Sequence, residues 1–181
     1  MYLNISLFNQ AGKEIQKVQV DEKFNLTNFL NTHHYFIEDI DLKKFIRDIN
    51  QAWNKNIKSF LFIDDSPELI EYFTDEAHAQ GHYAEGFVTS DDGYERYVAN
   101  PEAFDIVVLD YRMPGIDGGR VAQAFMELNQ NVRLVLLTGD ESLRPETINK
   151  IPIIYKPSRL KDIIEAASIY NYQSNFSKGK R

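Results

Sequence analysis

The sequence predicts an α/β fold: one open five-stranded parallel sheet with helices on both faces, preceded by a smaller α+β module. From Ser59 onward, short apolar runs alternate with segments of helical periodicity, which is typical of βα units. Several runs are continuously apolar, as expected for parallel strands buried on both faces. A chain of 181 residues, 43% hydrophobic and 26% charged, can hold such a domain and an accessory piece.

The elements of the sheet domain follow in order. The predicted strands span residues 59–64, 82–88, 105–110, 133–138 and 152–156. A helix is predicted after the first strand, with Ser66 as its N-cap, Pro67 at its first position and Gly81 as its stop. A second helix follows the last strand, with Ser158 as its expected cap and apolar residues at helical spacing on one face.

Residues 1–56 have a different pattern and form the predicted N-terminal module. Apolar residues alternate around the turn-like sequence NQAGKE, which predicts a hairpin. Residues 41–53 place an apolar stripe at helical spacing, and such a stripe more often packs within the protein than docks a partner. We expect the linker at 54–58, the sheet domain at 57–170, and a basic, solvated tail at 171–181.

Charge and composition narrow the function. The net charge is −7, and residues 57–170 carry all the excess acid, with twenty acidic and ten basic residues. This acidic surplus argues against a nucleic-acid partner and is compatible with cation binding. No apolar run is long enough to span a membrane, and the N-terminus does not resemble a signal peptide, so we expect a cytoplasmic protein without membrane insertion. The absence of cysteine excludes disulfides and thiolate chemistry.

Polar residues stand at the carboxyl ends of four predicted strands, which meet at one edge of a parallel sheet. They are Asp64 and Asp65, Asp110, Thr138 and Lys156. Three converging carboxylates repel one another unless a hard divalent cation lies among them, and all-oxygen ligation suits Mg²⁺ or Mn²⁺. A carboxylate there can also attack phosphorus and form an aspartyl phosphate, with a lysine to neutralise charge and a hydroxyl to bind a phosphoryl oxygen.

Four motifs in order, FIDDS, VVLDYRMPGIDG, LLTGD and YKPS, make residues 57–170 resemble the flavodoxin-like receiver domain of bacterial two-component response regulators. The resemblance implies that Asp110 accepts the phosphoryl group and that Asp64, Asp65, Asp110 and the backbone carbonyl of Arg112 hold Mg²⁺. It also implies Thr138 as the switch hydroxyl, Lys156 as the phosphoryl partner and a cis Lys156–Pro157 bond. The implied donor is a histidine kinase or phosphotransfer protein.

The sequence also departs from that family. The position three residues before the lysine is usually Tyr or Phe, whose rotation accompanies movement of the threonine, and here it is Ile153. Only 17 residues separate Thr138 from Lys156, and Pro145 is one of them, so the helix between them is expected to be short or displaced. The output surface is therefore expected to differ from that of other receivers.

Three functions remain open at this point. The first is a response regulator without a DNA-binding effector, which is no metabolic enzyme and signals through an unknown protein partner or a homodimer. The second is a receiver-like interaction module that works without phosphorylation. The third is a phosphohydrolase with the same aspartyl-phosphate chemistry. Haloacid-dehalogenase-type phosphatases need a second aspartate two residues after the nucleophile, where this chain has Arg112, and this argues against the third. Arg112 and Asp140 could also steer the water that hydrolyses the phosphoryl group, or be simple surface charges.

Overall fold

A computed structural model describes residues 3–21, 24–33, 40–53, 56–114, 118–129, 131–144 and 151–169. Its main sheet is parallel and five-stranded, as predicted, and its strand order is β4-β3-β5-β6-β7. The strands are β3 (Ser59–Ile63), β4 (Tyr83–Phe87), β5 (Ile106–Asp110), β6 (Arg133–Thr138) and β7 (Ile153–Tyr155). After β3 the chain adds β4 on one side of β3, and after β4 it crosses to add β5 on the other side. The strand order therefore reverses between β3 and β5, and open sheets bind ligands at the carboxyl ends of two such strands.

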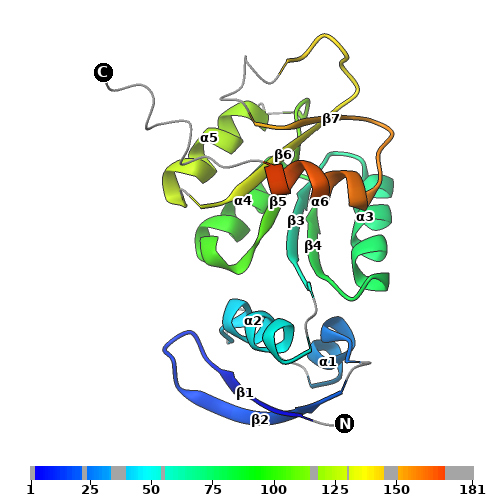
Figure 1. Ribbon diagram of the computed structural model, residues 1–181. Coiled ribbons are helices and arrows are strands. Elements are labelled where there is room, and N and C mark those ends of the chain that lie inside the picture. Colours follow the sequence, from blue (N-terminus) through cyan, green and yellow to red (C-terminus); the bar gives the residue numbers. More distant parts are fainter. Residues whose placement is uncertain are drawn as a thin grey trace, which may run out of the picture.

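Helices cover both faces of this sheet (Figure 1). One face carries α3 (Pro67–Ala79) and α6 (Leu160–Ile169), and the other carries α4 (Ser90–Ala99) and α5 (Gly118–Leu128), with a short 3-10 turn at Pro101–Ala103. Successive strand residues alternate between the two cores. Phe60 and Phe62 pack toward α3 and α6, whereas Leu61 and Ile63 join the core on the other face. Both faces are therefore dry, which explains the continuous apolar runs.

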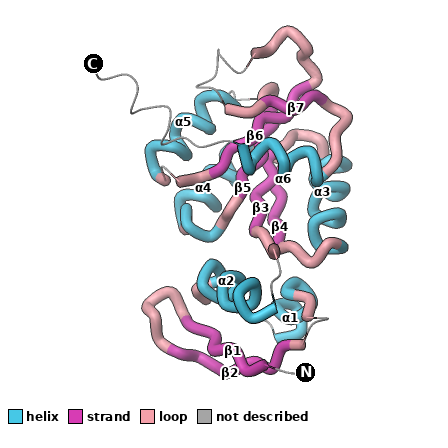
Figure 2. The backbone as a smooth tube through the Cα atoms, in the orientation of Figure 1, coloured by secondary structure: helices cyan, strands magenta, loops and turns pink. Residues whose placement is uncertain are grey.

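The N-terminal module is a two-stranded sheet with two helices on its inner face (Figure 2). Strands β1 (Leu3–Phe8) and β2 (Glu14–Val20) form the predicted antiparallel hairpin, followed by α1 (Leu26–His33) and α2 (Leu42–Trp53). The α2 stripe is buried inside the protein, as the sequence indicated. Its buried members are Leu42, Phe45, Ile46 and Ile49.

The module packs at the amino ends of the parallel strands, opposite their carboxyl ends (Figure 1). Lys43 of α2 donates to the carbonyl of Phe104 at 3.1 Å and pairs with Asp105 at 3.1 Å, just before β5. Asn50 exchanges two hydrogen bonds with the backbone of Ile57, at 2.8 and 3.0 Å. The expected linker is thus folded at the buried residue Ile57; its residues Asn54 and Lys55 lie outside the described part.

Helix caps follow the sequence at one site and not at the other. Ser66 caps α3 as predicted, accepting from the backbone N–H of Leu69 at 3.3 Å. Ser158 does not cap α6, and its buried hydroxyl has no hydrogen-bond partner in the described part of the protein. Instead, at the start of α6, the Asp162 carboxylate accepts from the N–H of Arg159 and the Glu76 carboxylate accepts from the N–H of Leu160.

Some expectations fall on residues outside the described part, namely Pro145 and the basic tail at 171–181. Between Thr138 and Lys156, the described residues 139–144 and 151–152 contain no helix. None of the described helices combines the length and the apolarity that a bilayer crossing requires.

Candidate functional site

Three carboxylates meet at the carboxyl edge of the sheet, where the sequence placed them. Asp64 and Asp65 follow β3, and Asp110 ends the adjacent β5. One oxygen of each lies within 4.8 Å of one oxygen of the others. Asp64 and Asp110 are buried, and Asp65 is exposed. Burial raises the pKa of Asp110, and the charges of Asp64 and Asp65 add to this, while Lys156 opposes it.

Lys156 joins two of these carboxylates. Its ammonium nitrogen lies 2.7 Å from Asp64 Oδ2 and 2.9 Å from Asp110 Oδ1. Burial alone would lower the pKa of Lys156, but the hydrogen bonds to the two carboxylates outweigh it, so the net shift is upward. The lysine is therefore charged at neutral pH. The following bond, Lys156–Pro157, is cis, as the resemblance implied.

Thr138 ends β6 beside this group and is almost fully buried. Its carbonyl accepts from the backbone N–H of Lys156 at 2.8 Å, so the two residues are linked through the main chain. Its hydroxyl accepts from the N–H of Asp140 at 3.0 Å. A hydroxyl that accepts one hydrogen bond still has a proton to donate, so Thr138 can bind a phosphoryl oxygen.

Arg112 and Asp140 form an ion pair across the loops that follow β5 and β6. The Asp140 carboxylate also accepts from the backbone and hydroxyl of Ser142, at 3.0 and 2.6 Å. The hydrogen bonds from Ser142, then those from Arg112, hold the pKa of Asp140 well below its usual range. The sequence did not indicate that these two residues contact each other, because they come from different loops.

Gly118 lets α5 begin directly against the end of β5. Its N–H donates to the carbonyl of Tyr111 at 3.2 Å. A Cβ atom at this position would lie 2.3 Å from the carbonyl oxygen of Asp110, closer than atoms can approach. Residues 115–117 of the same loop lie outside the described part.

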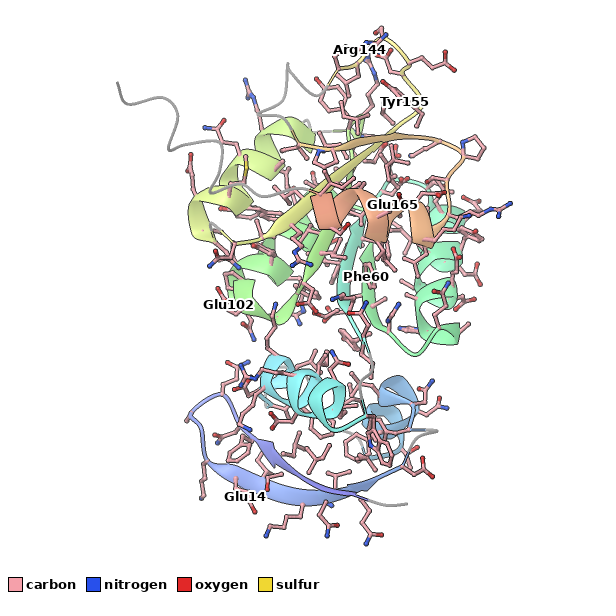
Figure 3. All side chains as sticks on the ribbon, viewed as in Figure 1. Glu14, Phe60, Glu102, Arg144, Tyr155 and Glu165 are labelled. Atoms are coloured by element: carbon pink, nitrogen blue, oxygen red, sulfur yellow. The ribbon has the colours of Figure 1, made fainter. Side chains whose placement is uncertain are left out.

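Sequence reasoning missed a second contact of the loop after β6. The Tyr155 hydroxyl donates to the carbonyl of Leu143 at 2.9 Å and accepts from Arg144 at 3.1 Å. Figure 3 shows Tyr155 and Arg144 together at the carboxyl edge. Ile153, at the position that the resemblance gives to an aromatic residue, is half-buried against the core. Because Ile153 and Tyr155 are two residues apart on one strand, their side chains lie on the same face of the sheet. This alternation is the sequence signal that could have indicated an aromatic side chain on that face.

The cluster fits a divalent cation by its chemistry. All three acidic residues offer oxygen, the donor that Mg²⁺ and Mn²⁺ prefer. Three carboxyl groups lie beside one ammonium, so acidic groups outnumber basic ones in the cluster. The doubly wound sheet and its acidic carboxyl edge are both features that the resemblance to receiver domains implies.

Comparison with known proteins agrees with the resemblance of the sequence to receiver domains. The family model of the response regulator receiver domain matches residues 60–168. The chain is 21% identical over 112 residues to the response regulator receiver protein CpdR of Brucella abortus, covering 60% of this chain and 92% of that protein. It is 27% identical over 110 residues to the chemotaxis protein CheY of Treponema pallidum, covering 58% of this chain and 76% of that protein.

Solved structures show the same fold. A receiver domain from Clostridium thermocellum has a TM-score of 0.57 at 18% identity, covering 67% of this chain and 99% of that one. CheY in a CheX–CheY–BeF₃–Mg²⁺ complex from Borrelia burgdorferi has a TM-score of 0.56 at 23% identity, covering 65% and 92%. The chain belongs to the response regulator receiver family of two-component signalling. Receiver domains are generally signalling proteins rather than classical enzymes.

Proposed function

We propose that this protein is a cytoplasmic response regulator that accepts a phosphoryl group on Asp110 and signals through protein contacts. The observation that carries the proposal is the surroundings of Asp110: it is buried, lies beside two more carboxylates and is held 2.9 Å from the Lys156 ammonium. A structural ion pair needs one carboxylate for one lysine. The surplus acidic residues are what metal-assisted phosphoryl transfer requires.

In the proposed reaction, a carboxylate oxygen of Asp110 attacks the phosphorus of a phosphohistidine on a histidine kinase or phosphotransfer protein. The P–N bond breaks, and its electron pair leaves with the imidazole nitrogen. The Lys156 ammonium compensates charge on the transferred group, and the Thr138 hydroxyl donates to one of its oxygens. Asp64, Asp65, Asp110 and the Arg112 carbonyl would hold Mg²⁺ or Mn²⁺, which when bound neutralises phosphoryl oxygens. In a neighbouring structure, CheY is complexed with BeF₃, Mg²⁺ and CheX.

The first test is intact mass spectrometry after incubation with acetyl phosphate and Mg²⁺. We expect the mass of one phosphoryl group on the wild type, and none with Asp110→Asn or in EDTA. The same mass increase in Asp110→Asn would overturn the assignment of Asp110 as the phosphorylated residue. Size-exclusion of the same samples shows whether phosphorylation drives a homodimer. An unmodified but folded wild type would favour the phosphorylation-independent module, and sustained phosphate release from many small phosphate esters would favour the phosphohydrolase.

A further inference from the structure

The segment 156–159 joins β7 to α6 and carries Lys156, so whatever holds this strap also holds the lysine. At its upstream end, the backbone N–H of Lys156 is bound to the carbonyl of Thr138 at 2.8 Å. At its downstream end, the N–H of Arg159 donates to Asp162 Oδ2 at 3.0 Å, and the N–H of Leu160 donates to Glu76 Oε2 at 3.2 Å. The first two partners, Thr138 and Asp162, are neighbours in the sheet and in sequence, but Glu76 comes from α3, 84 residues before Leu160.

Glu76 is well placed for this contact. It is half-buried near the end of α3, and Gln80 donates to its other oxygen at 3.3 Å. Its carboxylate also acts on the Tyr72 hydroxyl, whose pKa it raises. The first N–H groups of a helix have no acceptors within the helix and attract negative charge. Glu76 therefore takes the capping role that the Ser158 hydroxyl does not fill.

Side-chain packing supports the strap only in part. A pocket of about 560 Å³ that opens to solvent lies between α3 and the strap. Its lining residues are Leu69, Tyr72, Phe73, Lys156, Pro157, Ser158, Arg159 and Asp162. Where such a space separates two elements, directed hydrogen bonds rather than close packing restrain them. The Glu76–Leu160 bond is a restraint of this kind, and it ties α6 to α3.

We propose that Glu76 is a positioning residue for Lys156: by capping α6 from α3, it fixes the strap and so keeps the ammonium between Asp64 and Asp110. The inference rests on the proposed role of Lys156 in phosphoryl transfer. Small displacements of a charge-compensating group are costly to such reactions, because the stabilisation depends on its distance from the reacting atoms. Glu76 itself touches none of the site residues that the sequence identified.

The test compares Glu76→Ala with Glu76→Gln, whose amide oxygen can still accept from Leu160. Glu71→Ala, an exposed acidic residue of the same helix, is the matched control. The first readout is the Nζ signal of Lys156 in protein with ¹⁵N-labelled lysine, assigned through its loss in Lys156→Arg. The second is the phosphorylation rate with acetyl phosphate at saturating Mg²⁺.

We expect Glu76→Ala to shift or broaden the Lys156 signal and to slow phosphorylation about tenfold. The Gln variant and the Glu71→Ala control should stay within about twofold of the wild type, because both keep the hydrogen bond. An unchanged Lys156 signal in Glu76→Ala would overturn the proposal, as would a Gln variant as impaired as the Ala variant. If the wild type itself is not phosphorylated, the proposed function fails, while the NMR signal still decides the role of Glu76.

Discussion

Lys156 occupies the place in the site where a cation is needed most. It lies within 2.9 Å of carboxylate oxygens from β5 and from the loop after β3. Its pKa is raised despite partial burial, because the two carboxylates stabilise the ammonium form. Asp64 and Asp110, the two partners of the lysine, are also proposed metal ligands. Lysine and the proposed metal would therefore share the compensation of one negative cluster.

Replacing this lysine should separate metal binding from signalling. With Lys156→Ala we expect Mg²⁺ to bind at least as tightly as in the wild type, because one competing cation is gone, measured by calorimetry. The amide NMR shifts that phosphorylation causes near Thr138 should be lost. Lys161→Ala, an exposed lysine on α6, serves as the control. Loss of Mg²⁺ binding in Lys156→Ala would contradict this account.

His82 gives the protein a predictable pH dependence. Burial and then the charge of Lys58 lower its pKa below the ordinary 6.5, with Asp105 opposing, and its Nδ1 accepts from the Lys58 N–H at 3.3 Å. The unfolded chain therefore binds this proton more readily than the folded one. The stability that neutral His82 contributes is complete above about pH 6.5 and is lost as the pH falls through the lowered folded pKa.

We expect urea unfolding to show this loss as the pH falls below about 6.5. Because acidic residues also titrate as the pH falls, the measurement is the difference from His82→Gln, which cannot be protonated. Wild type and variant should converge in stability toward acid. Parallel pH profiles for the two proteins would mean that His82 does not carry the effect.

At the scale of elements, side-chain contacts connect the loop after β5, the loop after β6 and the edge strand β7 at the carboxyl end of the sheet. The loop after β6 is held on one side by the Arg112–Asp140 ion pair and on the other by the Tyr155–Leu143 hydrogen bond. Thr138, which begins this loop, is thus connected to β5 and β7. A movement of the Thr138 hydroxyl toward a phosphoryl group would therefore also displace the loop after β5 and strand β7.

The start of α5 is equally constrained, and Gly118→Ala tests it. The new methyl group would press on the Asp110 carbonyl, so we expect a loss of roughly 1–3 kcal/mol in the free energy of unfolding. Gly139→Ala is the matched control, because a Cβ there meets nothing within 4 Å. Chemical denaturation of both variants provides the measurement. Equal stability of the two would show that the α5 start relaxes freely.

At the scale of the whole molecule, the N-terminal module lies at the amino ends of the parallel strands, whereas the site lies at their carboxyl ends (Figure 1; Figure 3 labels Glu14 of the module and Tyr155 at the far end). Asp105 and Ser59, at the starts of β5 and β3, are joined by reciprocal hydrogen bonds at 2.9–3.0 Å. Lys43 of the module forms an ion pair with the same Asp105 carboxylate. These strands lead to Asp110 and to Asp64 and Asp65. The module thus contacts the strands that carry the site, at the end away from it.

Lys43→Ala should loosen this junction. We expect a loss of about 1 kcal/mol, the scale of a partly exposed ion pair, with faster amide exchange in α2 and at the start of β5. Lys44→Ala is the control, because its partner Asp48 lies within α2. Its effect should stay inside the module. Unchanged exchange at β5 in Lys43→Ala would mean that the module and the sheet domain are not coupled there.

Much of the fold and the site could be predicted from local pattern. Apolar runs that end in Asp64, Asp110, Thr138 or Lys156 mark strands, and parallel strands bring their ends to one edge. Helix α4 was not singled out, because Gly93 interrupts it and weakens its propensity. In the structure, a Cβ at Gly93 would lie 2.4 Å from Ile63, so close packing on the sheet explains both the glycine and the helix.

The amino-acid sequence by itself determined the α/β class, the strands at whose ends the acidic residues stand and the residues of the candidate site. The tertiary structure alone decided the long-range contacts: Glu76 with α6, Arg112 with Asp140 between two loops, and Lys43 with the residues before β5. The reason is physical. Periodicity and capping act over a few residues, whereas these contacts join residues far apart in the chain and depend on the packing of elements that no local pattern describes.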